Sequence, residues 1–264
     1  MQTISHLLTA SGVLWQEFAA FMLGLCIGSF LNVCIYRIPV SRSIISPGSA
    51  CLSCGQPIRF YDNIPVLSYL ILKGRCRNCH ATYSIRYPLI ELITGLFALG
   101  VFLRWGPSLT SVIYFAFIAM LLVITCIDLD HFIIPDVISL PGVPAGVLAS
   151  FFLPAMTVKD SILGLLLGGG ILLATAWTYK HLTHRDGMGG GDIKLLAMIG
   201  AFIGWQGVLI TLFVGALAGT LAGGAVMLHT RSSMKLKIPF GPFLAIGALT
   251  YLFFGDTLIL WYWR

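Results

Sequence analysis

The sequence predicts an all-α protein that crosses a membrane several times, and three observations support this. Hydrophobic residues make up 58% of the 264 residues and charged residues 10%, with a mean hydropathy of +0.92. Soluble domains average roughly 45–50% apolar and about 25% charged residues. Several apolar runs are long enough to cross a hydrocarbon core, which takes about 20 residues, and helix-breaking sequences separate them.

About eight apolar segments are expected to be transmembrane helices. They are residues 14–36, 89–105, 109–127, 137–153, 161–179, 193–206, 208–228 and 243–260. Breaker residues stand in WGPS at Trp105, LPAMTVKD at Leu153 and GWQG at Gly204. The first segment has no basic stretch before it and no small-residue cleavage site after it, so we expect an anchor rather than a removed signal peptide.

The distribution of basic residues predicts the orientation, because Lys and Arg accumulate in cytoplasmic loops. With the N-terminus outside, thirteen Lys and Arg residues face the cytoplasm and three face the other side. The formal net charge of +6 is explained by loops that face an anionic lipid leaflet. The lipid bilayer is therefore the expected partner, and nucleic acid is not.

A hydrophilic segment, residues 38–88, separates the first two predicted spans and contains two C-x-x-C pairs. Cys51 and Cys54 are followed after 21 residues by Cys76 and Cys79. Such pairs in a cytoplasmic loop are typical of a tetrahedral zinc site, and a segment this small needs a metal to stabilise its fold. Two redox dithiols are the alternative, and His80 could replace one ligand.

Two aspartates are expected at similar depth on the cytoplasmic face. Asp128 ends the third predicted span, and Asp192 begins the sixth, whose 14 residues extend about 21 Å. Asp192 would therefore lie below the membrane surface, where an ionisable side chain costs a few kcal/mol and usually has a function. A helix cap is the alternative for Asp192, and Asp136 is expected to cap the fourth segment in this way.

A close pair of carboxylates in a partly dry site suits peptide hydrolysis. The two groups cannot both ionise cheaply, so they share one proton. The ionised member takes a proton from water while the protonated member polarises the peptide carbonyl. Gly189 and Gly191, beside Asp192, would let an extended substrate backbone approach, although a flexible connector has the same composition.

Several blocks of the sequence together resemble one known family. They are GSFLNVCIYRIP from Gly28, DNIPVLSYL and GRCRNC in the cysteine segment, YPLIE from Tyr87, IDLDHFIIPD from Ile127, GMGGGDIKL from Gly187 and KIPFGPF from Lys237. From about residue 24 to 243 the chain is similar to type IV prepilin peptidases, which are G-x-G-D intramembrane aspartyl proteases. Leu52 departs from the pattern, since many members have Pro there.

The resemblance implies the catalytic pair, the substrate and the location. Asp128 lies seven residues before Pro135, as the first catalytic aspartate of the family does, so Asp128 and Asp192 would be catalytic and Asp130 a solvated neighbour. Such enzymes remove the leader of type IV prepilins, or of type II secretion pseudopilins, at the cytoplasmic side of the bacterial inner membrane. Many then methylate the new N-terminus with S-adenosylmethionine. The division would be residues 1–37 as the first span, 38–88 as the zinc domain and 89–264 as the peptidase domain.

The remaining site residues are assigned from their position. A methyltransferase site is implied by the resemblance alone, and Glu91 and Gly95, at the start of the second predicted span, are its candidates. Lys237, Pro239 and Gly241 are placed to border the aspartates as substrate contacts, or else form a proline-terminated loop.

A non-catalytic assembly scaffold stays open, and so do two other functions. One is a peptidase without methyltransferase activity. The other is a proton-coupled transporter whose two aspartates relay protons; a second glycine block in the other half of the chain, typical of transporter repeats, is absent from the sequence.

Overall fold

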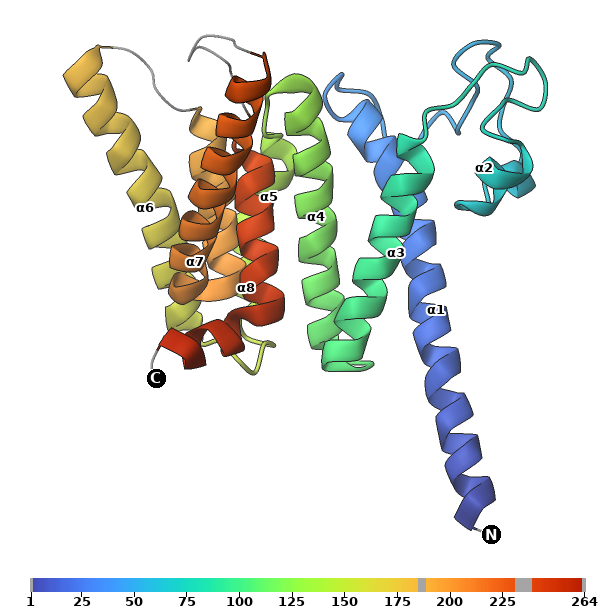
Figure 1. The fold of residues 1–264 in the computed structure, drawn as a ribbon, viewed down its shortest axis with the longest axis horizontal. Helices are drawn as coiled ribbons and strands as arrows, with labels where there is room; N and C mark the ends of the chain where they lie inside the picture. Colours follow the sequence, from blue (N-terminus) through green and yellow to red (C-terminus); the bar gives the residue numbers. More distant parts are fainter. Residues whose placement is uncertain (1, 185–188, 231–238, 263–264) are drawn as a thin grey trace. The chain divides into compact units, whose positions relative to one another are not determined.

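The computed structural model describes residues 2–184, 189–230 and 239–262, and in these ranges the fold is helical (Figure 1). Its elements are α1 (Gln2–Arg37), the 3₁₀ helix η1 (Phe60–Asp62), α2 (Leu67–Ile71), α3 (Arg86–Trp105), α4 (Leu109–His131), α5 (Asp136–Ala149), α6 (Val158–Thr183), α7 (Gly190–Thr230) and α8 (Gly241–Tyr262). The β-type backbone pairing within the described ranges consists of two isolated β-bridges. The predicted all-α class is confirmed.

Six helices of the described ranges are long and apolar enough to cross a membrane. These spans are Leu14–Arg37, Arg86–Trp105, Leu109–His131, Val158–Thr183, Gly190–Leu228 and Gly241–Leu258. The predicted fourth span is the shorter helix α5, whose 14 residues extend only about 21 Å. The predicted sixth and seventh spans both lie in α7, so each of the eight segments corresponds to helix. The chain is a multi-pass membrane protein.

The predicted helix breaks are present. Gly106 ends α3 with φ 65°, and Gly204 interrupts α7 with φ 73° and ψ 177°. The chain reverses direction within α7 (Figure 1). Thr157 begins α6 with a capping box, because its hydroxyl accepts from Asp160 N–H at 3.2 Å while the Asp160 carboxylate accepts from Thr157 N–H at 3.1 Å.

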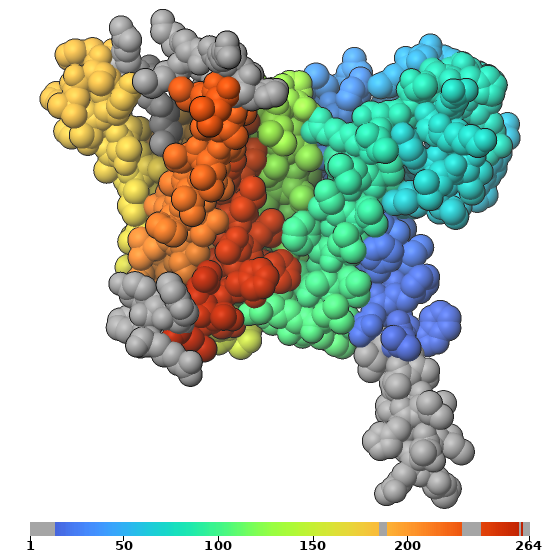
Figure 2. Space-filling view, viewed as in Figure 1, coloured from blue at the N-terminus to red at the C-terminus, as the bar shows by residue number. Residues whose placement is uncertain are grey.

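Contacts divide the chain into two compact units, Met1–Ala119 and Met120–Arg264. In the first unit, α1 packs directly against α3. A Cβ atom on Gly28 would lie 2.7 Å from the Cα of Glu91, and one on Gly24 would lie 2.8 Å from the Cα of Gly95. Small residues four positions apart thus let the two backbones touch. The cysteine segment forms a compact body beside these helices (Figure 2).

In the second unit, α7 packs against α5, α6 and α8. The carbonyl oxygen of Gly200 in α7 occupies the place that a Cβ atom on Gly164 of α6 would need. The Ser161 hydroxyl donates to the Ala201 carbonyl at 2.7 Å along the same contact. These close contacts place the start of α7, with Asp192, among the neighbouring helices.

Candidate functional site

Asp128 lies near the C-terminal end of α4, and its side chain is buried, with 5% of the residue exposed. Its Oδ2 accepts a hydrogen bond from the Gly241 backbone N–H at 2.9 Å. Gly241 is the first residue of α8. The first N–H groups of a helix have no partner inside it and carry partial positive charge. The start of α8 therefore supplies a donor to a buried carboxylate.

Gly241 can make this contact because it has no side chain. A Cβ atom there would lie 2.6 Å from Asp128 Oδ2 and 3.5 Å from Leu195 Cδ2. A larger residue would push the carboxylate away from the helix start. Gly241 was expected to contact substrate. Its packing against Asp128 is a second reason why this position requires glycine.

Asp192 lies in the first turn of α7 and is half-buried. Its carboxylate is close enough to that of Asp128 for the two charges to interact. The helix begins at Gly190, so Asp192 lies within the first turn and not before it, where a cap would lie. The structure thus brings the two aspartates together from different helices of one compact unit, and it does not support the cap interpretation.

An ion pair that the sequence did not indicate holds the neighbouring helix starts together. Lys194 Nζ lies 2.8 Å from both carboxylate oxygens of Asp136. Pro135 takes the N-cap position of α5, and no side chain caps it. The prediction that Asp136 caps this helix was therefore wrong, because its carboxylate binds Lys194 instead. The pair joins the starts of α5 and α7 two residues from Asp192.

The other predicted substrate residues have different surroundings. Gly189 is exposed, and a Cβ atom on it would be in ordinary contact with Asp192 Oδ2 at 3.7 Å. A Cβ atom on Gly191 would lie 2.9 Å from the Cβ of Ile134, so tight packing also favours glycine there. Pro239 is half-buried two residues before α8. Lys237 lies outside the described residues.

The four cysteines of the two C-x-x-C pairs come together. The sulfur atoms of Cys51, Cys54, Cys76 and Cys79 all lie within 4.8 Å of one another, and Cys51 and Cys79 Sγ are 3.7 Å apart. In a tetrahedral site with Zn–S bonds of about 2.3 Å, neighbouring sulfurs lie about 3.8 Å apart. All seven cysteines fall in the described ranges, and none forms a disulfide. The donor set fits a thiophilic ion such as zinc.

The two pairs adopt the same turn. Gly55 N–H donates to the Cys51 carbonyl at 2.8 Å, and His80 N–H donates to the Cys76 carbonyl at 3.0 Å. Gly55 and His80 have positive φ values of 71° and 57°. His80 is thus the turn residue equivalent to Gly55, and it is not a member of the sulfur cluster.

Backbone amides favour the thiolate form of two cysteines. The N–H groups of Cys54 and Ser53 lower the pKa of Cys51 to about 6. Those of Cys79 and Asn78 lower the pKa of Cys76 in the same way. Since thiolates are the metal-binding form, these backbone contacts favour Cys51 and Cys76 as metal ligands.

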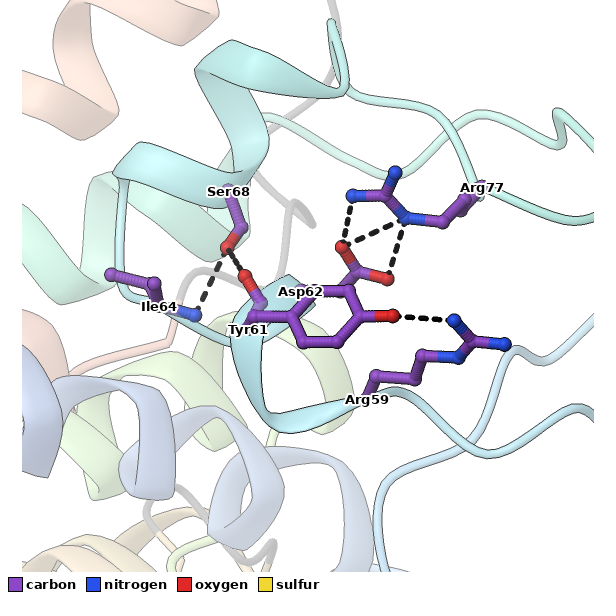
Figure 3. A network of polar contacts seen from close by, with 6 residues as sticks. All are labelled: Arg59, Tyr61, Asp62, Ile64, Ser68 and Arg77. Carbon is purple, nitrogen blue, oxygen red and sulfur yellow. Dashed lines mark hydrogen bonds and ion pairs between the residues drawn. The ribbon is translucent and has the colours of Figure 1, made fainter.

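A polar network fixes the second cysteine pair against η1 (Figure 3). The Arg77 guanidinium donates to both carboxylate oxygens of Asp62, with Nε at 3.0 and 2.9 Å, and it holds the pKa of that carboxyl below its ordinary value. The Ser68 hydroxyl donates to the Tyr61 carbonyl and accepts from Ile64 N–H, both at 3.0 Å. The cysteine segment is therefore ordered by side-chain contacts as well as by the sulfur cluster.

Comparison with known proteins identifies the family. Residues 22–105 match the bacterial peptidase A24 N-terminal domain, and residues 115–224 match the type IV leader peptidase family. A prepilin leader peptidase/N-methyltransferase from Aeromonas hydrophila is 36% identical over 96% of both chains. The chain belongs to the type IV leader peptidase family. A protein of the same name from Pseudomonas aeruginosa is 36% identical over 90% of both chains. Another, from Myxococcus xanthus, is 38% identical over 80% of this chain and 63% of that one. No solved structure matches the chain.

Glu91 and Gly95, the two residues predicted for a methyltransferase site of this leader peptidase, have different surroundings. Glu91 is 9% exposed, and its Oε2 accepts from Val66 N–H at 2.7 Å. It lines a cavity of about 210 Å³ between the end of α1, the start of α3 and the cysteine segment. Gly95 is not among the lining residues. A Cβ atom on Gly95 would lie 2.8 Å from Leu25 Cδ2, so this residue packs α3 against α1.

Proposed function

We propose that this chain is a membrane-embedded aspartyl endopeptidase that removes the leader peptide from type IV prepilins or pseudopilins. The single observation that carries the proposal is the pairing of Asp128 and Asp192 from two helices, with the start of α8 directed at Asp128. The names of the relatives, prepilin leader peptidases, support the substrate class. Family membership favours a peptidase over a proton-coupled transporter.

The two carboxylates have different surroundings, and these suggest their roles. The Gly241 N–H bond stabilises negative charge on Asp128, whereas the carboxyl of Asp192 interacts with that charge and is suited to hold the shared proton. Asp128 then takes a proton from water as the water oxygen attacks the scissile carbonyl carbon. Asp192 donates its proton to the carbonyl oxygen, and a later proton transfer to the amine nitrogen breaks the C–N bond.

The reaction is proposed to occur at the cytoplasmic side of the inner membrane. The excess of Lys and Arg in the segments next to both aspartates supports this orientation. The leader would approach as an extended chain along Gly189 and Pro239, beside Asp192 and before α8 respectively. The cysteine segment would lie on the same side.

A second activity, methylation of the new N-terminal amine, is proposed because the relatives' names include N-methyltransferase. S-adenosylmethionine would supply an electrophilic methyl group. The amine nitrogen would form the new C–N bond as the S–CH3 bond breaks, S-adenosylhomocysteine would leave, and the resulting ammonium would lose a proton. Zinc would have a structural role, held by Cys51, Cys54, Cys76 and Cys79.

The test uses purified full-length protein in detergent and a prepilin substrate, with leader loss followed by mass spectrometry. We expect Asp128→Asn and Asp192→Asn each to lower the cleavage rate about 10²–10⁴-fold, because an amide cannot transfer the required proton. Asp130→Asn, an exposed neighbour, is the matched control and should retain most activity. Full activity in either of the first two variants would refute the catalytic assignment. Cleavage in detergent, where no proton gradient exists, would exclude a purely transport function.

A further inference from the structure

The cavity in the first unit has walls from three parts of the chain. Helix α1 contributes Asn32 and Tyr36 near its C-terminal end, and α3 contributes Tyr87 and Glu91 in its first turns. The third wall is the cysteine segment, including Tyr83. The cavity therefore forms only when α1, α3 and the cysteine segment are packed together.

Glu91 brings a carboxylate into this cavity without a charged partner among the described residues. Its partners there are the Val66 N–H and the Ser29 hydroxyl, both uncharged donors. A buried charge is costly unless it is paired. A cationic ligand would supply the missing charge.

The backbone that touches Glu91 is strained. Val66 has φ 60° and ψ −49°, and a β-branched residue rarely adopts this region. Its N–H is the donor to Glu91 Oε2. Strained residues of this kind cluster at functional sites, where the surrounding contacts hold them in place.

The other lining groups suit an organic cation with a polar end. Tyrosines at positions 36, 69, 83 and 87 line the cavity, and aromatic faces attract alkylated cations. Arg37 and Arg75 also line it and can receive a carboxylate. Its volume of about 210 Å³ is below the roughly 300–1,000 Å³ of pockets that enclose a drug-sized ligand. The cavity fits a compact charged part of a ligand, with the remainder extending outward.

We propose that this cavity binds the methionyl and sulfonium part of S-adenosylmethionine, with Glu91 as the counter-charge of the sulfonium. The inference rests on the methyltransferase activity proposed above and specifies the site that this activity requires. S-adenosylmethionine has both features for which the cavity is suited, since it is an alkylated cation and carries an amino-acid carboxylate.

The sulfur cluster supports one wall of this site. The Tyr83 side chain hydrogen-bonds with the sulfurs of Cys76 and Cys51, and it also lines the cavity. Ala50 and Arg75, each adjacent to a metal-ligating cysteine, line the cavity too. Loss of the metal would therefore disturb the S-adenosylmethionine site, whereas Asp128 and Asp192 themselves lie in the other unit.

The test measures ligand binding directly by calorimetry on full-length protein in detergent. S-adenosylmethionine is compared with S-adenosylhomocysteine, its neutral thioether counterpart. Glu91→Gln keeps a carbonyl oxygen that can accept from Val66 N–H but removes the charge. We expect it to weaken S-adenosylmethionine binding about tenfold or more and to change S-adenosylhomocysteine binding less than about threefold. Glu17→Gln, the same change at the other glutamate of the chain, should bind both ligands normally.

A second variant tests the same site independently, in case Glu91→Gln misfolds. Tyr36→Leu removes a ring from the α1 wall and should also weaken S-adenosylmethionine binding more than S-adenosylhomocysteine binding. Leader cleavage is measured in the same samples and should be unchanged. If the wild type binds S-adenosylmethionine and both variants bind it equally well, or if both ligands weaken equally, the site assignment is wrong while the proposed function stands. If the wild type does not bind S-adenosylmethionine, the methyltransferase proposal fails as well.

Discussion

Replacing Gly241 by Ala should disable the peptidase without unfolding the protein. The new Cβ atom would lie 2.6 Å from Asp128 Oδ2. Ordinary contact begins at 3.4 Å, so the carboxylate or the start of α8 must move by about 0.8 Å. A displacement of about 1 Å at a reacting group can lower a rate about 10²-fold. Loss of a hydrogen bond to a charged group, about 1.5–3 kcal/mol, has a similar size.

The assay is leader cleavage under steady-state conditions, with kcat and KM determined separately. We expect kcat to fall about 100-fold while KM changes little, because the variant disturbs a catalytic group and not substrate binding. Gly170→Ala is the matched control, since a Cβ atom at this position of α6 meets no atom within 4 Å. The melting temperature and S-adenosylmethionine binding of Gly241→Ala should stay near the wild-type values.

Two results would refute this reasoning in different ways. Wild-type cleavage by Gly241→Ala would show that the start of α8 does not constrain Asp128. A large increase in KM with an unchanged kcat would instead support the sequence-based expectation that Gly241 contacts the substrate.

The remaining predictions concern the metal site and the helix packing. Wild-type protein should carry about one sulfur-ligated metal ion per chain. The Cys51→Ser, Cys54→Ser double variant should lose this ion, and it should lose methylation far more than cleavage. Mass spectrometry of a processed prepilin measures both activities. Methylation that persists while cleavage collapses would contradict this. Gly164→Ala should lower stability by about 1–3 kcal/mol, because its Cβ meets the Gly200 carbonyl; an unchanged melting temperature would contradict the close α6–α7 contact.

Local features of the structure follow from the sequence because they depend on neighbouring residues. The cysteine spacing dictates two similar turns, and both are present with the same hydrogen bonds. The helix breaks at Gly106 and Gly204 follow from residues that adopt positive φ without cost. The length and apolarity of the helices follow from the needs of a chain in lipid, where each backbone group must be paired within its own segment.

Which residues meet in each site depended on contacts between segments that are distant in the sequence. The sequence pointed to Asp128 and Asp192, but the Gly241 N–H that contacts Asp128 comes from 113 residues away. The local capping rule failed at Asp136, because Lys194, 58 residues further on, binds its carboxylate. Glu91 was predicted as a site residue, whereas its cavity and its contact with Val66 exist only once α1, α3 and the cysteine segment are packed. The apolar runs specify where the helices lie in the sequence, and only the packing of these helices decides which polar groups meet.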